Sequence, residues 1–143
     1  MSELKYFLSS NKKQRATVQY AATSTLCDDK GEPLKWTIKT LTTAENDKIR
    51  DDCMREVKVP GKPNMYRLRL DTSEYISKML AASVVEPDLF DRTLQDSYGV
   101  GTPEDLLKAM IDIPAEYDNF MAFIQNLNGF DVTLDDKVEE AKN

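Results

Sequence analysis

The sequence predicts an α+β fold that is mostly α, in which an N-terminal antiparallel β-hairpin, of two or three strands, precedes a compact bundle of about five helices. Two observations lead to this fold class. β-prone residues alternate with polar ones in 17–21 and 34–39, whereas apolar residues recur at helical spacing in the second half. We expect one domain over residues 1–143, with a mixed part at 1–70 and a helical part at 71–143.

The N-terminal third is expected to form a short helix and then the hairpin. Residues 3–9 would place their apolar side chains on one side of that helix. The hairpin is expected over 16–40, because the segment 28–33 between the two alternating stretches has the composition of a turn. In its second strand the alternation puts three apolar residues on one face, namely Leu34, Trp36 and Ile38.

The next segment is predicted to be a helix over residues 43–57. Thr42 or Thr43 would cap this helix, and acidic residues in its first turn suit the positive end of the helix dipole. Its apolar stripe is thin. Two prolines and a glycine indicate a loop at 59–64, and residues 58–64 are the candidate linker within the chain. Alternation at 65–70 predicts a third strand.

The second half of the sequence carries four helix patterns and a fifth at its end. Each begins at a residue that commonly caps a helix or at a proline. The expected helices run from Asp71 or Thr72 to before Pro87, from about Asp91 to Tyr98, from Thr102-Pro103 through Met110, from Pro114 to Leu127 ahead of Asn128-Gly129, and from Thr133 onward.

The residue types argue against catalysis and against a metal site. Histidine is absent, which removes the usual general base and the commonest metal ligand. Gly99-Val100-Gly101 resembles the start of a dinucleotide loop, but Glu104 stands where a third glycine is needed. Cys27 and Cys53 are expected to be reduced thiols. We therefore expect no enzyme activity, no cofactor and no metal.

Charge and hydropathy limit the partners. Residues 1–70 contain 14 basic and 9 acidic side chains, which gives a net charge of +5. Residues 71–143 contain 5 basic and 16 acidic side chains, which gives a net charge of -11. Such an acidic half would repel phosphates, so no nucleic-acid partner is expected. No apolar run approaches the roughly 20 residues of a membrane span, and the first residues are too polar for a secretory signal. We expect a cytoplasmic protein with no membrane partner.

Two segments carry a resemblance to a known family. They are Val84-Val85-Glu86-Pro87-Asp88-Leu89 and Leu94-Gln95-Asp96-Ser97-Tyr98-Gly99-Val100. Both resemble the XkdN-like family of phage tail assembly chaperones, known from PBSX-type prophages. Ala115 departs from the pattern, which has a glycine before the Glu-Tyr pair. The likeness extends in the same order over most of the chain, through Tyr6-Phe7-Leu8, Asn11-Lys12-Lys13, Trp36, Glu116-Tyr117, Asn128-Gly129-Phe130-Asp131 and Val138-Glu139-Glu140-Ala141-Lys142-Asn143.

The resemblance implies a non-enzymatic assembly factor in the cytoplasm of the host bacterium. Such proteins bind the tape-measure protein, keep it soluble and help to recruit tail-tube protein, and they leave before the virion is complete. Self-association is compatible with this role. The alternative is a structural phage protein, such as a tail completion or connector subunit, that is retained in the virion. A small regulator or nucleic-acid binder is a third option, which the acidic half disfavours.

A chaperone of this kind needs exposed apolar side chains that can cover a partner's apolar ridge and release it. Phe123 is the most suggestive anchor, because it lies off the main apolar stripe of its helix. For the other candidates, ordinary packing in the core is the competing interpretation. The candidate partner-binding residues are Tyr98, Met110, Phe120, Met121, Phe123 and Phe130.

Overall fold

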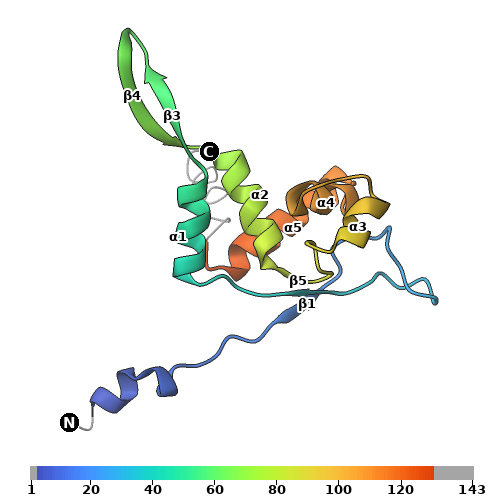
Figure 1. The fold of residues 1–143 in the computed structure, drawn as a ribbon. Helices are drawn as coiled ribbons and strands as arrows, with labels where there is room; N and C mark the ends of the chain where they lie inside the picture. The colour runs from blue at the N-terminus through green and yellow to red at the C-terminus, as the bar shows by residue number, and fades with distance from the viewer. Residues whose placement is uncertain (1–2, 131–143) are drawn as a thin grey trace, which may run out of the picture.

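The computed structural model describes residues 3–130 and confirms the α+β class. This part of the chain has five α-helices and a three-stranded sheet, and a second, two-stranded sheet projects away from the body (Figure 1). The helix expected from Thr133 onward lies outside the described residues.

The larger sheet is antiparallel and has the strand order β1-β2-β5. β1 (Val18–Tyr20) and β2 (Trp36–Ile38) pair along their whole length, which confirms the predicted hairpin. The third strand of this sheet is β5 (Val84–Glu86). The prediction that residues 65–70 supply the third strand of the hairpin sheet was therefore wrong.

The change from helix to strand at β5 explains why α2 (Thr72–Ser83) ends earlier than the sequence pattern suggests. Ser83 is the last residue of α2, and its hydroxyl donates to the carbonyl of Met79, one turn earlier, at 2.9 Å. The carbonyl of Ser83 already accepts from the backbone N–H of Lys39, at the end of β2, at 2.9 Å. Val84 and Val85 are β-branched and favour the strand that follows. A helix reaching through Val84 was thus a wrong prediction.

α1 (Thr43–Asp52) begins where the sequence indicates but ends well before residue 57. Thr42 and Glu45 form a capping box: the Thr42 hydroxyl accepts from Glu45 N–H at 3.1 Å, and the Glu45 carboxylate accepts from Thr42 N–H at 3.0 Å. The helix stops at Cys53, which is buried. The residues after it join a strand instead, so the predicted helix was too long.

β3 (Met54–Val59) and β4 (Lys62–Leu70) form the projecting hairpin. Pro60 and Gly61 make its turn, and Gly61 has a φ of +78°, a conformation that glycine adopts without steric cost. The predicted loop and linker at 58–64 is therefore a hairpin tip, and the strand predicted at 65–70 pairs with β3. At the base, the Asp71 N–H donates to the Cys53 carbonyl at 2.8 Å and closes the hairpin.

The remaining helices confirm the sequence pattern. α3 (Arg92–Ser97), α4 (Pro103–Met110) and α5 (Pro114–Leu127) all lie where they are expected. Asp91 caps α3 and Thr102 caps α4, because each side chain accepts a hydrogen bond from a backbone N–H of the first turn, at 2.9 and 3.1 Å. These caps fix the directions in which the two short helices leave their loops.

The core lies where the inner face of the sheet meets α2, α4 and α5. The core residues are Ala22, Trp36, Ile38, Leu80, Ala81, Leu89, Leu106, Leu107, Met110, Ile111, Phe120 and Ile124.

The first described residues form an N-terminal arm. It contains two short 3-10 helices, Leu4–Phe7 and Ser9–Asn11, whose side chains are exposed (Figure 1).

Candidate partner-binding site

Phe120, one of the six residues predicted from the sequence, is a core residue. Its exposed fraction is 0%, and its ring centroid lies 5.8 Å from that of Tyr20 and 6.1 Å from that of Trp36. The i, i+3, i+4 spacing that placed Phe120 among the candidates reflects the face of α5 that packs on the sheet. In this fold its side chain is not available to a partner.

Phe123 and Met121 lie at the edge of the same core and are partly buried. The Phe123 ring stacks on Tyr20 of β1, with 4.1 Å between the ring centroids and 14° between the planes. Stacking between aromatic rings stabilises a fold beyond the area that it buries. The Phe123 ring therefore packs α5 against the sheet, although Phe123 lies outside the main apolar stripe of its helix.

Tyr98 and Met110 both line an open apolar groove of about 340 Å³, but Met110 is also a core residue with an exposed fraction of only 6%. The C-terminal end of α3 supplies Tyr98 and the last turn of α4 supplies Met110, so the two candidates come together from different helices. Lys35 and Glu86 are the charged residues of its lining. The groove is lined by Leu26, Leu34, Lys35, Trp36, Glu86, Pro87, Leu94, Tyr98 and Met110.

Leu34 is the most accessible apolar residue of this groove, with an exposed fraction of 43%. The sequence pattern assigned it to the same buried face as Trp36 and Ile38. It is not buried, because β2 begins only at Trp36 and Leu34 belongs to the loop before it. The Leu34 N–H donates to the carbonyl of Leu26 at 2.8 Å, which holds this side of the groove in place. No local sequence signal brings Leu34 beside Tyr98.

Phe130 lies elsewhere, after the end of α5, with an exposed fraction of 42%. It borders a small pocket of about 150 Å³ that includes Arg15, Leu41 and Asn128. There the Asn128 side-chain oxygen accepts from the Leu41 N–H at 2.6 Å, and Arg15 donates to the Leu41 carbonyl at 3.2 Å. The six candidates thus divide among the core, the groove and this pocket.

The ionisable groups with displaced pKa values have structural explanations. Glu116 at the start of α5 accepts from the Thr23 hydroxyl at 2.7 Å and from the Ser24 N–H at 3.0 Å, and hydrogen bonds from Ser24 and Thr23 hold the pKa of Glu116 below its ordinary value. Burial raises the pKa of the Cys53 thiol, which keeps it protonated and a poor nucleophile. Neither arrangement provides a reactive centre.

Within residues 3–130, no three or more carboxylates, thiols or imidazoles are grouped as a metal site. In the same residues, no helix has the length and apolar character needed to cross a membrane. Cys27 is exposed and Cys53 is buried, and both are free thiols.

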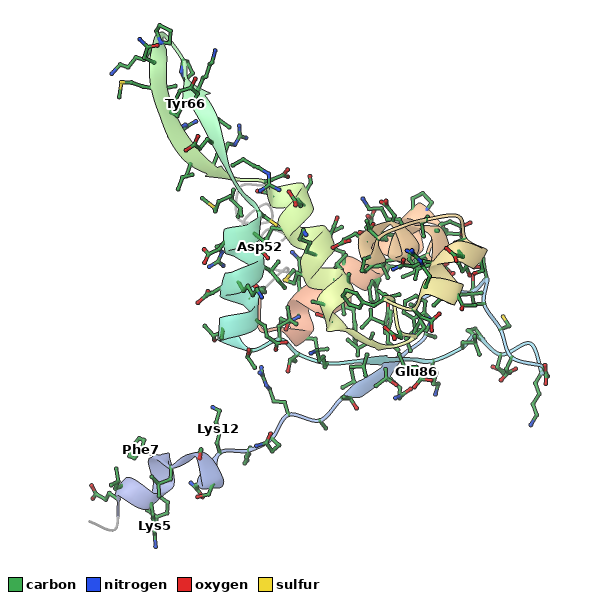
Figure 2. All side chains as sticks on the ribbon, viewed as in Figure 1. Lys5, Phe7, Lys12, Asp52, Tyr66 and Glu86 are labelled. Atoms are coloured by element: carbon green, nitrogen blue, oxygen red, sulfur yellow. The ribbon has the colours of Figure 1, made fainter. Side chains whose placement is uncertain are left out.

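Two further parts of the described chain expose large apolar side chains. Figure 2 shows Phe7 on the N-terminal arm and Tyr66 on the β3-β4 hairpin, both well away from the body. Exposed apolar clusters of this kind are typical of surfaces that contact other proteins. The residues concerned are Leu4, Tyr6, Phe7 and Leu8 on the arm, and Met65, Tyr66 and Leu68 on the hairpin.

An open apolar groove and two projecting elements with exposed apolar side chains are typical of proteins that bind other proteins. The chain matches the phage XkdN-like tail assembly chaperone proteins over residues 4–142, and it belongs to that family.

Among relatives, the phage-like element PBSX protein XkdN of Bacillus subtilis (strain 168) is 23% identical over 141 residues, which cover 99% of this chain and 94% of that protein. The uncharacterized protein YqbN of the same strain is also 23% identical over 141 residues, covering 99% and 93% of the two chains. The crystal structure of YqbN superposes with a TM-score of 0.72 at 18% identity, covering 88% of this chain and 95% of the other. That structure supports the fold described above.

Proposed function

We propose that this chain binds the tape-measure protein of its phage, keeps that protein soluble and helps to recruit tail-tube subunits during tail assembly. Membership of the tail assembly chaperone family supports the class of function. The observation that carries the proposal is the open apolar groove around Leu34, Tyr98 and Met110. No catalytic step is part of this function.

The shape and chemistry of the groove suit a helical segment of a partner. An amphipathic helix presents apolar side chains at i, i+3, i+4 and i+7, and an apolar groove covers that stripe. Leu34 offers the exposed apolar side chain of the groove, whereas Met110 is only 6% exposed and lines the groove from the core. Tyr98 offers a large apolar ring with a polar tip. Lys35 and Glu86 in the lining can pair with charges that flank the stripe.

The proposed place of action is the cytoplasm of the host bacterium, and the chain is absent from the finished virion. A chaperone must release its partner before the tail is complete, whereas a tail completion or connector subunit stays in the particle. Protein analysis of purified particles separates the two roles. Recovery of this chain at a fixed ratio to the tail-tube protein would support the structural role and overturn the chaperone role.

Coexpression with the tape-measure protein of the same phage tests the groove. The tape-measure protein should be found in the soluble fraction with the wild-type chain and in the pellet without it. Leu34→Glu places a charge in the apolar groove, so it should reduce the captured partner about tenfold, a loss of about 1.4 kcal/mol of binding free energy. Leu34 is partly exposed, so the thermal midpoint should stay near the wild-type value.

Ile113→Glu is the matched control, because Ile113 is similarly exposed, at 37%, but lies at the start of α5 and outside the groove. This variant should capture the tape-measure protein as the wild type does. A tape-measure protein that is soluble alone would contradict the proposed function. Equal capture by Leu34→Glu and the wild type would remove the groove as the binding surface.

A further inference from the structure

The base of the β3-β4 hairpin carries two arginines directly opposite each other. Arg55 of β3 and Arg69 of β4 are cross-strand partners in the register of the hairpin, and both side chains are exposed. Like charges at directly opposed positions of an antiparallel pair destabilise that pair. The two guanidinium groups therefore favour an anion that lies against them.

Only one of the two arginines has an acidic partner among the described residues. Arg55 donates to a carboxylate oxygen of Glu74 in α2 and to the backbone carbonyl of Asp52. Within residues 3–130, Arg69 forms no ion pair. The nearby Asp71 carboxylate caps α2, where it accepts from the Glu74 N–H at 3.1 Å. Arg69 is thus the charge of this site that can still pair with a carboxylate.

The same two arginines line an open pocket of about 380 Å³ at the base of the hairpin. Val57 and Leu70 add aliphatic surface to the pocket, and the first turn of α2 adds two hydroxyl side chains. Arginine binds carboxylates through paired, charge-assisted hydrogen bonds. The chemistry of the pocket therefore suits an acidic peptide segment that also carries aliphatic side chains.

A segment of this kind follows the described part of the chain. Residues 131–143 contain five acidic and two basic side chains, a net charge of -3, and they include Leu134 and Val138. Residues 54–70, which form the hairpin, contain five basic side chains and one acidic side chain, a net charge of +4. The two segments are complementary in charge, and both carry aliphatic side chains.

The described chain ends within reach of the pocket. The Asn128 side-chain oxygen accepts from the Leu41 N–H at 2.6 Å, so the chain leaves α5 beside the start of α1. The ten residues of α1 correspond to about 15 Å, and the hairpin leaves the body at the far end of that helix (Figure 1). A segment as long as 131–143 spans about 20 Å as a helix and about 43 Å when extended. Tethering at this distance gives the segment an effective concentration on the order of millimolar at the pocket.

We propose that the acidic segment 131–143 docks in the pocket at the base of the hairpin of its own chain, where its carboxylates pair with Arg69 and Arg55. The contact neutralises the opposed arginines and covers the aliphatic lining of the pocket. It is independent of the tape-measure function proposed above, since the pocket and the apolar groove have no lining residue in common.

Carbodiimide cross-linking of the full-length chain tests the contact, because this reagent joins a carboxylate to an amine that is paired with it. Arg69→Lys places an amine at the site and keeps the positive charge. Mass spectrometry should then find amide bonds between position 69 and acidic residues of 131–143. Arg92→Lys is the matched control, because Arg92 is also exposed but lies at the start of α3. It should give no such cross-links.

A mixture of unlabelled and heavy-nitrogen-labelled Arg69→Lys protein shows whether the contact lies within one chain. Cross-linked peptide pairs should then be all light or all heavy. Pairs with one light and one heavy member, in the proportion expected for random pairing, would place the segment on another copy and would overturn the proposal.

Charge reversal tests the pairing itself. Amide hydrogen exchange in residues 131–143 should be faster in Arg69→Glu than in the wild type, by about tenfold or more, because the variant repels the acidic segment. Lys62→Glu is the matched control, since it makes the same change of charge near the tip of the same hairpin. Exchange in this control should stay as in the wild type.

A second reversal should restore the contact. Arg69→Glu is combined with reversal of one acidic pair, either Asp135→Lys/Asp136→Lys or Glu139→Lys/Glu140→Lys. At least one of the two combined variants should recover the slow exchange, since opposite charges then face each other again. Damage to the fold at position 69 would not be repaired in this way.

Three results would each overturn the proposal. They are an absence of cross-links between position 69 and residues 131–143, equal exchange of that segment in the wild type and Arg69→Glu, and failure of both combined variants to slow the exchange.

Discussion

Replacing Phe123 by alanine should destabilise the protein, because the ring stacks on Tyr20 and packs against the core. A fully buried Phe→Ala change costs about 3–5 kcal/mol. The Phe123 ring keeps part of its surface in water, so we expect a loss of about 2–3 kcal/mol. About 0.5–1.5 kcal/mol of this loss belongs to the stacking contact with Tyr20.

Urea denaturation followed by circular dichroism measures this loss. With a slope of about 2 kcal/mol per molar urea, the midpoint should fall by about 1–1.5 M at an unchanged slope. A double-mutant cycle with Tyr20→Leu should give a coupling energy of about 0.5–1.5 kcal/mol, since the two rings contact each other. Phe90→Ala is the control, because that exposed ring should cost less than about 0.5 kcal/mol.

The result that would refute this reasoning is a Phe123→Ala protein as stable as the wild type that no longer captures the tape-measure protein. Phe123 would then be a free anchor, as its position off the main stripe of the helix suggests from the sequence alone. If the free energy of unfolding falls while capture of the tape-measure protein hardly changes, the Phe123 ring contributes to folding and not to partner binding.

Two further predictions concern single hydrogen-bonded contacts. Thr42→Ala removes the capping box of α1 and should lower the free energy of unfolding by about 1 kcal/mol in urea denaturation, whereas Thr42→Ser should restore most of it. The lowered pKa of Glu116 means that its contribution to stability is complete above the ordinary value of 4.5 and is lost as the pH falls through its folded pKa. The midpoint temperature of thermal unfolding should therefore fall less below pH 4.5 in Glu116→Gln than in the wild type. Glu32→Gln, at an exposed position, is the control for the loss of one charge. An equal fall of the midpoint in the wild type and Glu116→Gln would contradict this assignment.

Local signals were sufficient for the elements whose boundaries are set by nearby residues. Asp91, Thr102 and Pro114 mark helix starts by cap chemistry and a fixed φ, and all three helices begin there. The β1-β2 hairpin could also be predicted, since its turn composition and alternation lie within one short stretch.

The errors occurred where distant pairing decides the structure. Residues 54–59 continue a weak helical pattern, and only their pairing with β4 makes them a strand. Val84 and Val85 follow a clear helical stripe, but β2 offers them an open edge to pair with. The sheet and hairpin contacts that override local propensity were not visible from spacing alone.

The candidate site was predictable only in part, for the same reason. Tyr98 and Met110 were among the six candidate apolar anchors predicted from the sequence, and they do line one groove. Leu34 and Pro87 complete the groove from loops that the fold brings beside them, so neither stood out in the sequence. Phe120 satisfied the same helical spacing but faces the sheet, where it is fully buried.

Because the base of the β3-β4 hairpin is closed, the hairpin could be longer or shorter without a change in the rest of the fold. Cys53 and Asp71 are joined there by a backbone hydrogen bond, so the polypeptide leaves and re-enters the body at one point. Lengthening or shortening both strands by a residue would move the tip by about 3.4 Å while leaving the folded body as it is. Related chains could in this way differ in how far the tip stands from the body without altering any residue of the core.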